Sequence, residues 1–275
     1  MSPSRVSASS SSSSLRVSLL VLAPLLLLLR VCVCSELKVL VRLSDGLITA
    51  ETLESDSERD IISVEFRHTD GALITLLADF KRHVKIVRAL VLGEPERGQT
   101  HYQGLCFITR LEHGEIIPSE AMVRLRQKNP HLVRTAEEKR GLERMSMNMV
   151  VNLTLSWHLS SHIRSMCRDA HDFIYTREQD VKYWREKGVE GSVFKAFPVN
   201  AESADMANCS ATTDPWQPCL CSYTMRLEWY PCMLKYCRGH GPSPYKCGIR
   251  SCSKAYRFDF YTSRKQLCMW DEENV

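Results

Sequence analysis

The chain has 275 residues and carries 36 lysine and arginine residues against 32 aspartate and glutamate residues. Its first 35 residues hold three of the arginines and no acidic residue, so the rest of the chain has 33 basic and 32 acidic residues. This balance argues against a nucleic-acid-binding protein, which needs an excess of clustered positive charge. The remaining length of about 240 residues suits one large domain or two modest ones.

Residues 1–35 have the pattern of a secretory signal peptide. Arg5 and Arg16 supply a basic start, and the apolar run at 17–29 is interrupted by Pro24 and is short for a membrane span. We expect cleavage near Cys34 or Ser35, with an uncleaved signal anchor as the alternative. Since no later stretch reaches transmembrane length, the sequence predicts a secreted, extracellular protein with no transmembrane segment.

Alternating apolar residues predict strands from residue 36 onward. The runs ELKVLVRL and IISVEFRH are followed by the turn signals 44–46 (SDG) and 69–71 (TDG), which are typical of hairpins. The segments ALITLLADF, HVKIVRALVL and GLCFITRL continue the series. We expect an antiparallel sheet with one buried face.

Helical signals follow the strands. Pro118 suits the first turn of a helix that ends at 129–130 (NP), and REQDVKYWREK at 177–187 predicts a second one. Thr176 and Gln179 have the spacing of a capping box. Further expected elements are a charged segment at 134–145, of which 137–141 (EEKRG) is expected to be solvated, a strand at 148–155, a short helix at 160–170 and a short strand at 172–176. Strands followed by helices predict an α+β fold, an antiparallel sheet with flanking helices.

The composition changes near residue 188. A small, polar stretch predicts a linker at 188–208, which separates an α+β domain at 36–187 from a cysteine-rich module at 209–275. Eight cysteines fall in these last 67 residues, a density typical of disulfide scaffolds.

In a secreted protein this cysteine usage predicts disulfides. The eight cysteines of the module are Cys209, Cys219, Cys221, Cys232, Cys237, Cys247, Cys252 and Cys268. A zinc site is the alternative, although only His240 lies among them and the C-x-C and C-x4-C spacings differ from the usual zinc pairs. We therefore expect no metal and no cofactor, and the sequence cannot choose the connectivity.

Cys106 and Cys167 stand alone in the middle of the chain. Pairing would protect both thiols from oxidation during export, whereas two reduced core cysteines are the alternative. A Cys106–Cys167 bridge would close a loop of roughly 60 residues and contribute about 4 kcal/mol in the chain-entropy model.

Three segments resemble the BRICHOS domain pattern: LLADFKRHVKIVRAL, GLCFITRLEHGEIIPSEAM and SSHIRSMCRDAHDFIYT. The resemblance covers 36–187 and implies that Asp79, Cys106 and Cys167 are its signature positions. The connection at 92–104 is longer than in that pattern. Following this resemblance, we hypothesise that Asp79 is buried and links packing to pH; an aspartate at a strand end that faces solvent or caps a turn is the alternative.

Nearly the whole chain after the leader is similar to the Out at first family. The segments that carry this resemblance include ADFKRHVKIVRALVLGE, WYPCMLKYC and PYKCGIRSC. The resemblance implies a secreted protein with no established enzymatic activity.

Aromatic residues are dense in the module and have two interpretations. They either fill a thin disulfide core or form a binding face for a protein partner. The aromatic residues are Trp216, Trp229, Tyr230, Tyr236, Tyr245, Tyr256, Phe258, Phe260, Tyr261 and Trp270. Basic residues beside them would favour acidic partners or sulfated glycans. These are Arg238, Lys246, Arg250, Lys254 and Arg257.

Two sequons, at Asn152 and Asn208, predict glycosylation, with unused sequons as the alternative. No catalytic motif is present, and Cys106 beside His101, His113 or His162 lacks any local signature of a nucleophile pair. The sequence therefore predicts a non-enzymatic extracellular binding protein of the signalling type whose partner it does not name. A chaperone that holds β-prone segments on its BRICHOS-like sheet is the second hypothesis.

Overall fold

The computed structural model describes residues 34–98, 101–125, 129–170, 174–197, 206–238 and 243–269. Most of the predicted signal peptide, the centre of the predicted linker, His240 and Trp270 lie outside these residues. No helix among the described residues combines the length and the apolarity needed to cross a membrane.

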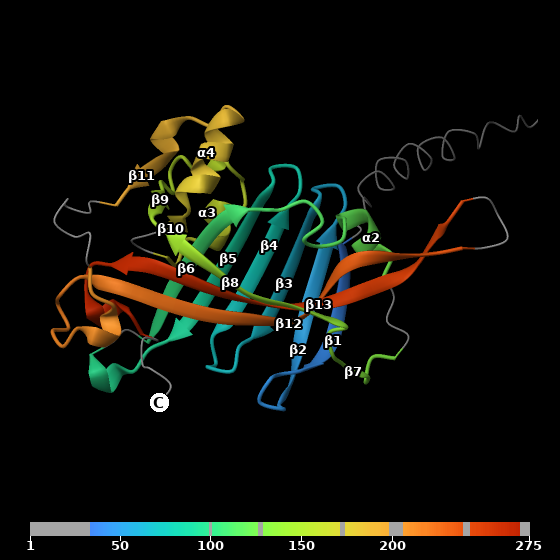
Figure 1. Ribbon diagram of the computed structural model, residues 1–275, viewed down its shortest axis with the longest axis horizontal. Helices are drawn as coiled ribbons and strands as arrows, with labels where there is room; N and C mark the ends of the chain where they lie inside the picture. Colours follow the sequence, from blue (N-terminus) through green and yellow to red (C-terminus); the bar gives the residue numbers. More distant parts are fainter. Residues whose placement is uncertain are drawn as a thin grey trace, which may run out of the picture. The chain divides into compact units, whose positions relative to one another are not determined.

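Ten strands form one large mixed sheet (Figure 1). Their bounds are β1 Cys34–Arg42, β2 Ile48–Asp56, β3 Ile61–Arg67, β4 Leu73–Asp79, β5 Val84–Leu92, β6 Tyr102–Arg110, β7 Val133–Arg134, β9 Met149–Val151, β10 Ile174–Thr176 and β11 Phe194–Ala196. Their order across the sheet is β11-β9-β10-β6-β5-β4-β3-β2-β1-β7. The strands from β1 to β6 form an antiparallel meander, while β10 runs parallel to β6 and β7 parallel to β1.

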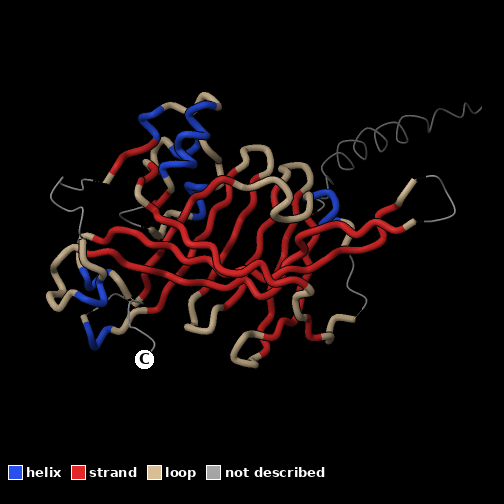
Figure 2. The backbone as a smooth tube through the Cα atoms, in the orientation of Figure 1, coloured by secondary structure: helices blue, strands red, loops and turns tan. Residues whose placement is uncertain are grey.

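Three longer strands form a second sheet in the order β12-β13-β8. They are β8 Glu138–Met147, β12 Cys219–Cys237 and β13 Tyr245–Thr262. The strands β12 and β13 form an antiparallel hairpin, and β8 pairs with β13 in parallel. Figure 2 shows the hairpin running across the strands of the large sheet.

The predicted hairpin turns are confirmed. The turn between β1 and β2 contains Gly46 at φ 91°, and the turn between β3 and β4 contains Gly71 at φ 83°. Asp45 and Asp70 each accept a hydrogen bond from the backbone N–H two residues later. These aspartate–glycine pairs allow the left-handed backbone that a tight hairpin requires.

The main core lies between the two sheets. Val64, Leu76 and Phe107 of the large sheet pack against Tyr223 and Phe258 of the small one. The rings of Phe107 and Phe258 stack with their centroids 4.0 Å apart. Burial of this apolar area, at about 25 cal/mol per Å², is the main favourable term that holds the sheets together.

Three short helices cover other parts of the large sheet. They are α2 Ser119–Val123, α3 Ile163–Met166 and α4 Glu178–Glu186. The opposite face of the sheet packs on α3 and α4 through Ile86, Ile108, Ile163 and Trp184. Both faces are therefore covered along the middle of the sheet.

The predicted α+β class, an antiparallel sheet with flanking helices, is wrong. The described chain is mostly strand, its sheets are mixed, and the helices are short. The helix predicted from Pro118 ends at Val123, and no side-chain hydrogen bond caps the start of α4. The capping box expected at Thr176 is therefore absent, because the Thr176 hydroxyl is buried without a partner.

One long strand, β8, was not predicted, because most of it comes from the charged segment at 134–145. Its half-buried positions include Arg140 and Glu143 instead of apolar residues. Glu143 is paired by Lys254 at 2.7 Å and by Arg177 at 3.5 Å. An alternation whose inward positions are charged does not show the hydrophobic period that identifies a strand.

That residues 188–208 form a linker between two domains remains a prediction. The structure places residues from both predicted domains in one sheet, since β8 lies before the linker and β13 after it. They also share one hydrophobic core.

Candidate functional site

Every cysteine that was predicted to be bonded lies in a disulfide. The pairs are Cys106–Cys167, Cys209–Cys219, Cys221–Cys268, Cys232–Cys252 and Cys237–Cys247. The expectation of disulfides is thereby confirmed. Because β12 and β13 are antiparallel, their two C-x4-C motifs join across the hairpin as two successive rungs instead of within each motif.

One cysteine cluster has the compactness of a metal site. The sulfur atoms of Cys209, Cys221 and Cys268 lie within 4.8 Å of one another. Each of them is bonded in a disulfide, so none is a thiolate available to a zinc ion.

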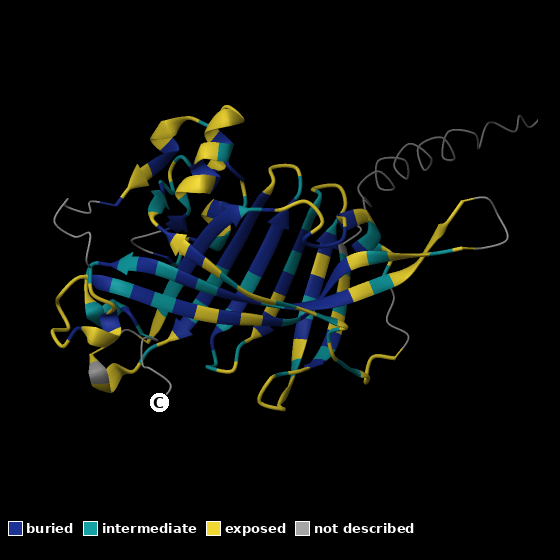
Figure 3. Ribbon diagram, in the orientation of Figure 1, coloured by how far each residue is buried: buried dark blue, intermediate teal, exposed yellow. Residues whose placement is uncertain are grey.

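The outer end of the β12–β13 hairpin is the most exposed part of the small sheet. We call its described residues, 233–238 and 243–250, the stapled arm, because Cys237–Cys247 joins its two strands. The side chains of Tyr236 and Tyr245 are 59% and 56% exposed. Figure 3 shows exposure increasing along the hairpin toward this end.

The stapled arm is also basic. Residues 233–250 contain four lysine or arginine residues and no acidic residue. Lys235 pairs with Glu137 at 2.7 Å and Arg250 with Glu138 at 3.6 Å. Within the described chain, Arg238 and Lys246 have no acidic partner, so the end of the arm presents uncompensated positive charge.

Some aromatic residues of the predicted module fill the core, and others are exposed and available for binding. Those that fill the core are Trp229, Tyr230, Tyr256, Phe258 and Phe260, all buried. Exposed ones are Trp216, Tyr236 and Tyr245. Of the predicted basic residues, Lys254 is paired with Glu143, Arg257 with Asp259 and Arg250 with Glu138. Within the described chain this leaves Arg238 and Lys246 without an acidic partner.

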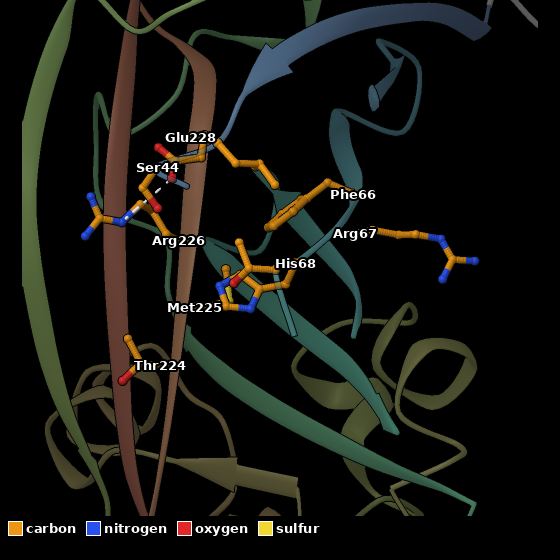
Figure 4. A pocket seen from close by; sticks show the side chains of 10 residues that line it. Ser44, Phe66, Arg67, His68, Thr224, Met225, Arg226 and Glu228 are labelled. Carbon is orange, nitrogen blue, oxygen red and sulfur yellow. Dashed lines mark ion pairs between the residues drawn. The ribbon is translucent and has the colours of Figure 1, made fainter. Parts of the chain in front are cut away.

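A small cleft of about 200 Å³ lies beside β12, near the ends of β1 and β3 (Figure 4). Phe66, His68 and Met225 are turned toward its centre, whereas Arg67 points away. On its other side Arg226 forms an ion pair with Glu228 at 3.9 Å.

The polar groups of this cleft do not form a nucleophile–base pair. The Nδ1 atom of His68 lies 3.0 Å from the carboxylate of Asp70, but Ser44 makes no hydrogen bond with His68 in the described structure. An activated hydroxyl needs such a bond to its base. The other nucleophile considered, Cys106, is bonded to Cys167.

The structure buries Asp79 at the end of β4. One carboxylate oxygen accepts a hydrogen bond from the Ser160 hydroxyl at 2.6 Å, and the other accepts one from the Arg82 backbone N–H at 3.0 Å. Asp79 is thus buried, as hypothesised, and also caps a turn, as the alternative proposed.

An ionic cluster that sequence reasoning missed lies between the sheets. Lys85 of β5 is buried and donates to the Glu115 carboxylate at 2.6 Å. Tyr256 of β13 donates to the same oxygen at 2.8 Å, and Lys254 lies 3.5 Å from it. Burial alone would raise the pKa of Glu115, but Lys85, Lys254 and these hydrogen bonds lower it to about 2.

A second buried carboxyl, Glu51 of β2, has the opposite environment. It is fully buried beneath β12, and neither of its oxygens has a hydrogen-bond partner in the described structure. The Trp229 backbone N–H lies close enough to favour the ionised form, without completing a well-aligned hydrogen bond. Burial, together with the nearby charge of Glu228, raises the pKa of Glu51 well above its usual value.

The two predicted glycosylation sites have different local structures: Asn152 precedes a turn, and Asn208 forms an isolated β-bridge with Leu220. Asn152 accepts hydrogen bonds from the backbone N–H and the hydroxyl of Thr154. Asn208 precedes Cys209, which is bonded to Cys219. The use of either sequon remains a prediction.

Comparison with known proteins agrees with one of the two resemblances. A family model described as Out at first matches residues 35–184, and one described as Out at first, C-terminal matches residues 208–272. Neither of these two models is BRICHOS, and that part of the resemblance stays a prediction. No solved structure matches the chain.

The matched relatives include two fly proteins, each called Out at first protein. The chain is 40% identical over 253 residues to that of Drosophila melanogaster, which covers 86% of this chain and 52% of that protein. It is also 40% identical over 252 residues to that of Drosophila virilis, which covers 86% of this chain and 83% of that protein. The chain thus spans about half the length of the first relative.

Proposed function

Since the chain belongs to the Out at first family, we propose that it is a secreted, non-enzymatic protein that binds an extracellular protein partner through the stapled arm. The partner surface that suits this arm is acidic. The observation that carries the proposal is a disulfide-bonded hairpin end that exposes aromatic and basic side chains together.

The disulfides support the extracellular part of the proposal. Disulfides persist in oxidising compartments and are rare in the cytosol. Five of them, one of which joins residues 61 positions apart, would be difficult to maintain in a reducing compartment. The predicted signal peptide is consistent with the same location.

The composition of the arm supports the binding part. Tyrosine and arginine are enriched among the residues that dominate protein interfaces, because they combine apolar contact area with hydrogen-bonding groups. The staple restricts the conformations of the free arm, which would lower the entropic cost of ordering it on association. The charge of Arg238 and Lys246 would steer an acidic partner toward the arm.

The experiment is a comparison of two tyrosine variants in the purified full-length secreted protein. Binding to arrayed extracellular domains is measured for the wild type, for the double variant Tyr236→Ala/Tyr245→Ala, and for Tyr102→Ala as control. Tyr102 has the same side chain and a similar exposure but lies on β6. We expect the double variant to bind the captured partner at least about tenfold more weakly, and the control to bind normally.

Equal binding by the double variant and the wild type would contradict the role of the arm. A specific turnover of any small molecule by the purified protein would contradict the non-enzymatic assignment.

A chaperone-like role is the second candidate, and one observation favours it. The strand β12 lies at the edge of the small sheet and borders the cleft of Figure 4, so a β-prone segment could add to it by main-chain hydrogen bonds. The test is fibril formation of unrelated peptides. A chaperone delays it at substoichiometric amounts, whereas a protein with one dedicated partner does not.

A further inference from the structure

We propose that a second cleft, on the far side of the large sheet from the stapled arm's hairpin, is a binding site for an acidic saccharide, a sugar that carries sulfate or carboxylate groups. The cleft has a volume of about 450 Å³. It is lined by Arg59, Lys81, Arg82, Trp157, Ser161 and His162, and by the buried Asp79. We call it the Trp157 cleft. The inference does not depend on the role of the arm.

Three cations converge on the Trp157 cleft from two turns. Arg59 belongs to the turn between β2 and β3, and Lys81 and Arg82 belong to the turn between β4 and β5. Arg82 has no acidic partner in the described chain. The ammonium group of Lys81 donates to a backbone carbonyl, that of Glu58, at 2.6 Å, so no carboxylate neutralises its charge.

Two carboxylates near the cleft, those of Asp56 and Asp79, compensate part of this positive charge. Asp56 lies 3.5 Å from the Nε atom of Arg59, a loose pair in which the arginine is 68% exposed. Such exposed pairs are weak and exchange readily with other anions. The carboxylate of Asp79 is already engaged by two hydrogen bonds from Ser160 and Arg82.

Trp157 gives the cleft an aromatic wall. It lies in a single turn of 3-10 helix, and its side chain is 61% exposed. One neighbour, His158, packs against it with ring centroids 3.6 Å apart and the ring planes tilted by 30°, which limits the orientation of the indole. An exposed indole face is suited to the apolar C–H face of a pyranose ring, while nearby cations and hydroxyls bind its substituents.

Asp79 connects the two segments that form the cleft, the turn with Lys81 and Arg82 and the segment with Trp157 and Ser161. Its hydrogen bond to the Arg82 backbone fixes the turn that carries two of the cations, and its hydrogen bond to Ser160 fixes the segment that carries Trp157 and Ser161. The Cys106–Cys167 disulfide anchors the same segment to β6 a few residues later. A site built on such constraints is preorganised, which lowers the cost of binding.

An acidic saccharide fits this set of groups better than a simple anion does. Inorganic sulfate would use the cations but would gain nothing from Trp157. A sugar with sulfate or carboxylate groups uses the indole face, the cations and the Ser161 hydroxyl together. Arginine and lysine provide charge-assisted hydrogen bonds to such anions, and each is stronger than a neutral one.

The test measures binding of a heparin-derived hexasaccharide by calorimetry at physiological salt, using the full-length secreted protein. The variants are Arg82→Gln and Trp157→Ala, both at exposed positions, with unchanged thermal unfolding as the check on folding. The control is the arm variant Arg238→Gln/Lys246→Gln, which removes two cations elsewhere. The chemically desulfated hexasaccharide and inorganic sulfate are the control ligands.

We expect the hexasaccharide to bind the wild type and the arm variant equally, and each cleft variant at least about tenfold more weakly. Desulfation, which leaves the carboxylates, should weaken binding at least about tenfold, and inorganic sulfate should bind far more weakly than the hexasaccharide. Loss of binding in the arm variant with normal binding in the cleft variants would overturn the inference and would place anion binding on the arm. If Trp157→Ala bound the hexasaccharide as tightly as the wild type does, and inorganic sulfate bound as tightly as the hexasaccharide, the saccharide assignment would be overturned. Neither result bears on partner binding through Tyr236 and Tyr245.

Discussion

At the scale of single residues, the two buried carboxyls show how environment sets charge. Glu115 has two cations and a phenol around it and stays ionised, whereas Glu51 has only another acid and apolar side chains and favours the neutral form. The sequence around each glutamate does not predict this difference, since both lie in segments that mix polar and apolar residues. The difference arises from residues that fold next to them.

Glu51 should make the protein less stable as pH rises. In the unfolded chain its carboxyl ionises near its usual pKa, about 4.5, while the folded protein keeps it protonated to higher pH. The unfolded state therefore releases a proton first, and the free energy of unfolding falls as pH increases above that value, by up to about 1.4 kcal/mol per pH unit.

Replacing Glu51 with Gln or Met should remove this fall in stability. We expect Glu51→Met to gain stability relative to the wild type between pH 4 and pH 7 in denaturant titrations. Glu54→Gln, at an exposed position of the same strand, serves as control and should follow the wild type. The same pH dependence in Glu51→Met and wild type would show that Glu51 is not the group responsible.

At the scale of elements, the β12–β13 hairpin performs two different tasks along its length. Its inner part carries Tyr223, Tyr256 and Phe258 into the core, and its outer part exposes tyrosines and cations to solvent. The change occurs near the Cys232–Cys252 disulfide, whose cysteines are buried. Beyond that point the hairpin has little core of its own, and Cys237–Cys247 compensates for the missing burial.

Removal of the outer staple should loosen the arm without unfolding the core. The bond closes a loop of ten residues, for which the chain-entropy model gives about 2–3 kcal/mol. In Cys237→Ser/Cys247→Ser we expect faster hydrogen exchange in the arm, with protection of β5 and β6 unchanged. The matched variant Cys232→Ser/Cys252→Ser should instead lower the global unfolding midpoint. Unchanged exchange in the arm would mean that its strands are stable without the staple.

At the scale of the whole molecule, packing of one sheet on the other joins segments far apart in the chain. The cluster around Glu115 is the polar part of this junction, since Lys85 comes from the large sheet and Tyr256 from the small one. Its groups are mutually satisfied, which is the condition under which buried charge is tolerated. The remaining contact between the sheets is apolar, with the Phe107–Phe258 stack near its centre.

Loss of the Glu115 charge should weaken the contact between the sheets. Glu115→Gln leaves Lys85 buried without a carboxylate, and we expect a loss of about 3–5 kcal/mol at pH 7 in denaturant titrations. Because folding lowers the pKa of Glu115 to about 2, the wild type should lose this contribution as pH falls from about 4.5 toward 2. The variant should lack that acid dependence.

Glu112→Gln provides the matched control in the same loop. Glu112 is 56% exposed and pairs with Arg110 at the surface, so its replacement should change stability by less than about 0.5 kcal/mol. An equal effect of the two substitutions would contradict the structural importance of the buried cluster.

Local chemistry was enough to predict several features of this protein from its sequence. The aspartate–glycine turns, the strands β1 and β3 to β6, and the disulfide between Cys106 and Cys167 depend on near neighbours or on the compartment. Tertiary structure alone decided the rest: that a charged run becomes β8, that the C-x4-C motifs join across a hairpin, and that Glu51 and Glu115 differ in charge. These features depend on contacts between residues from 10 positions apart, as in Cys237–Cys247, to roughly 180 apart, as in Glu51 and Glu228. A local pattern carries no information about which distant side chain will pair with a charge or a strand edge.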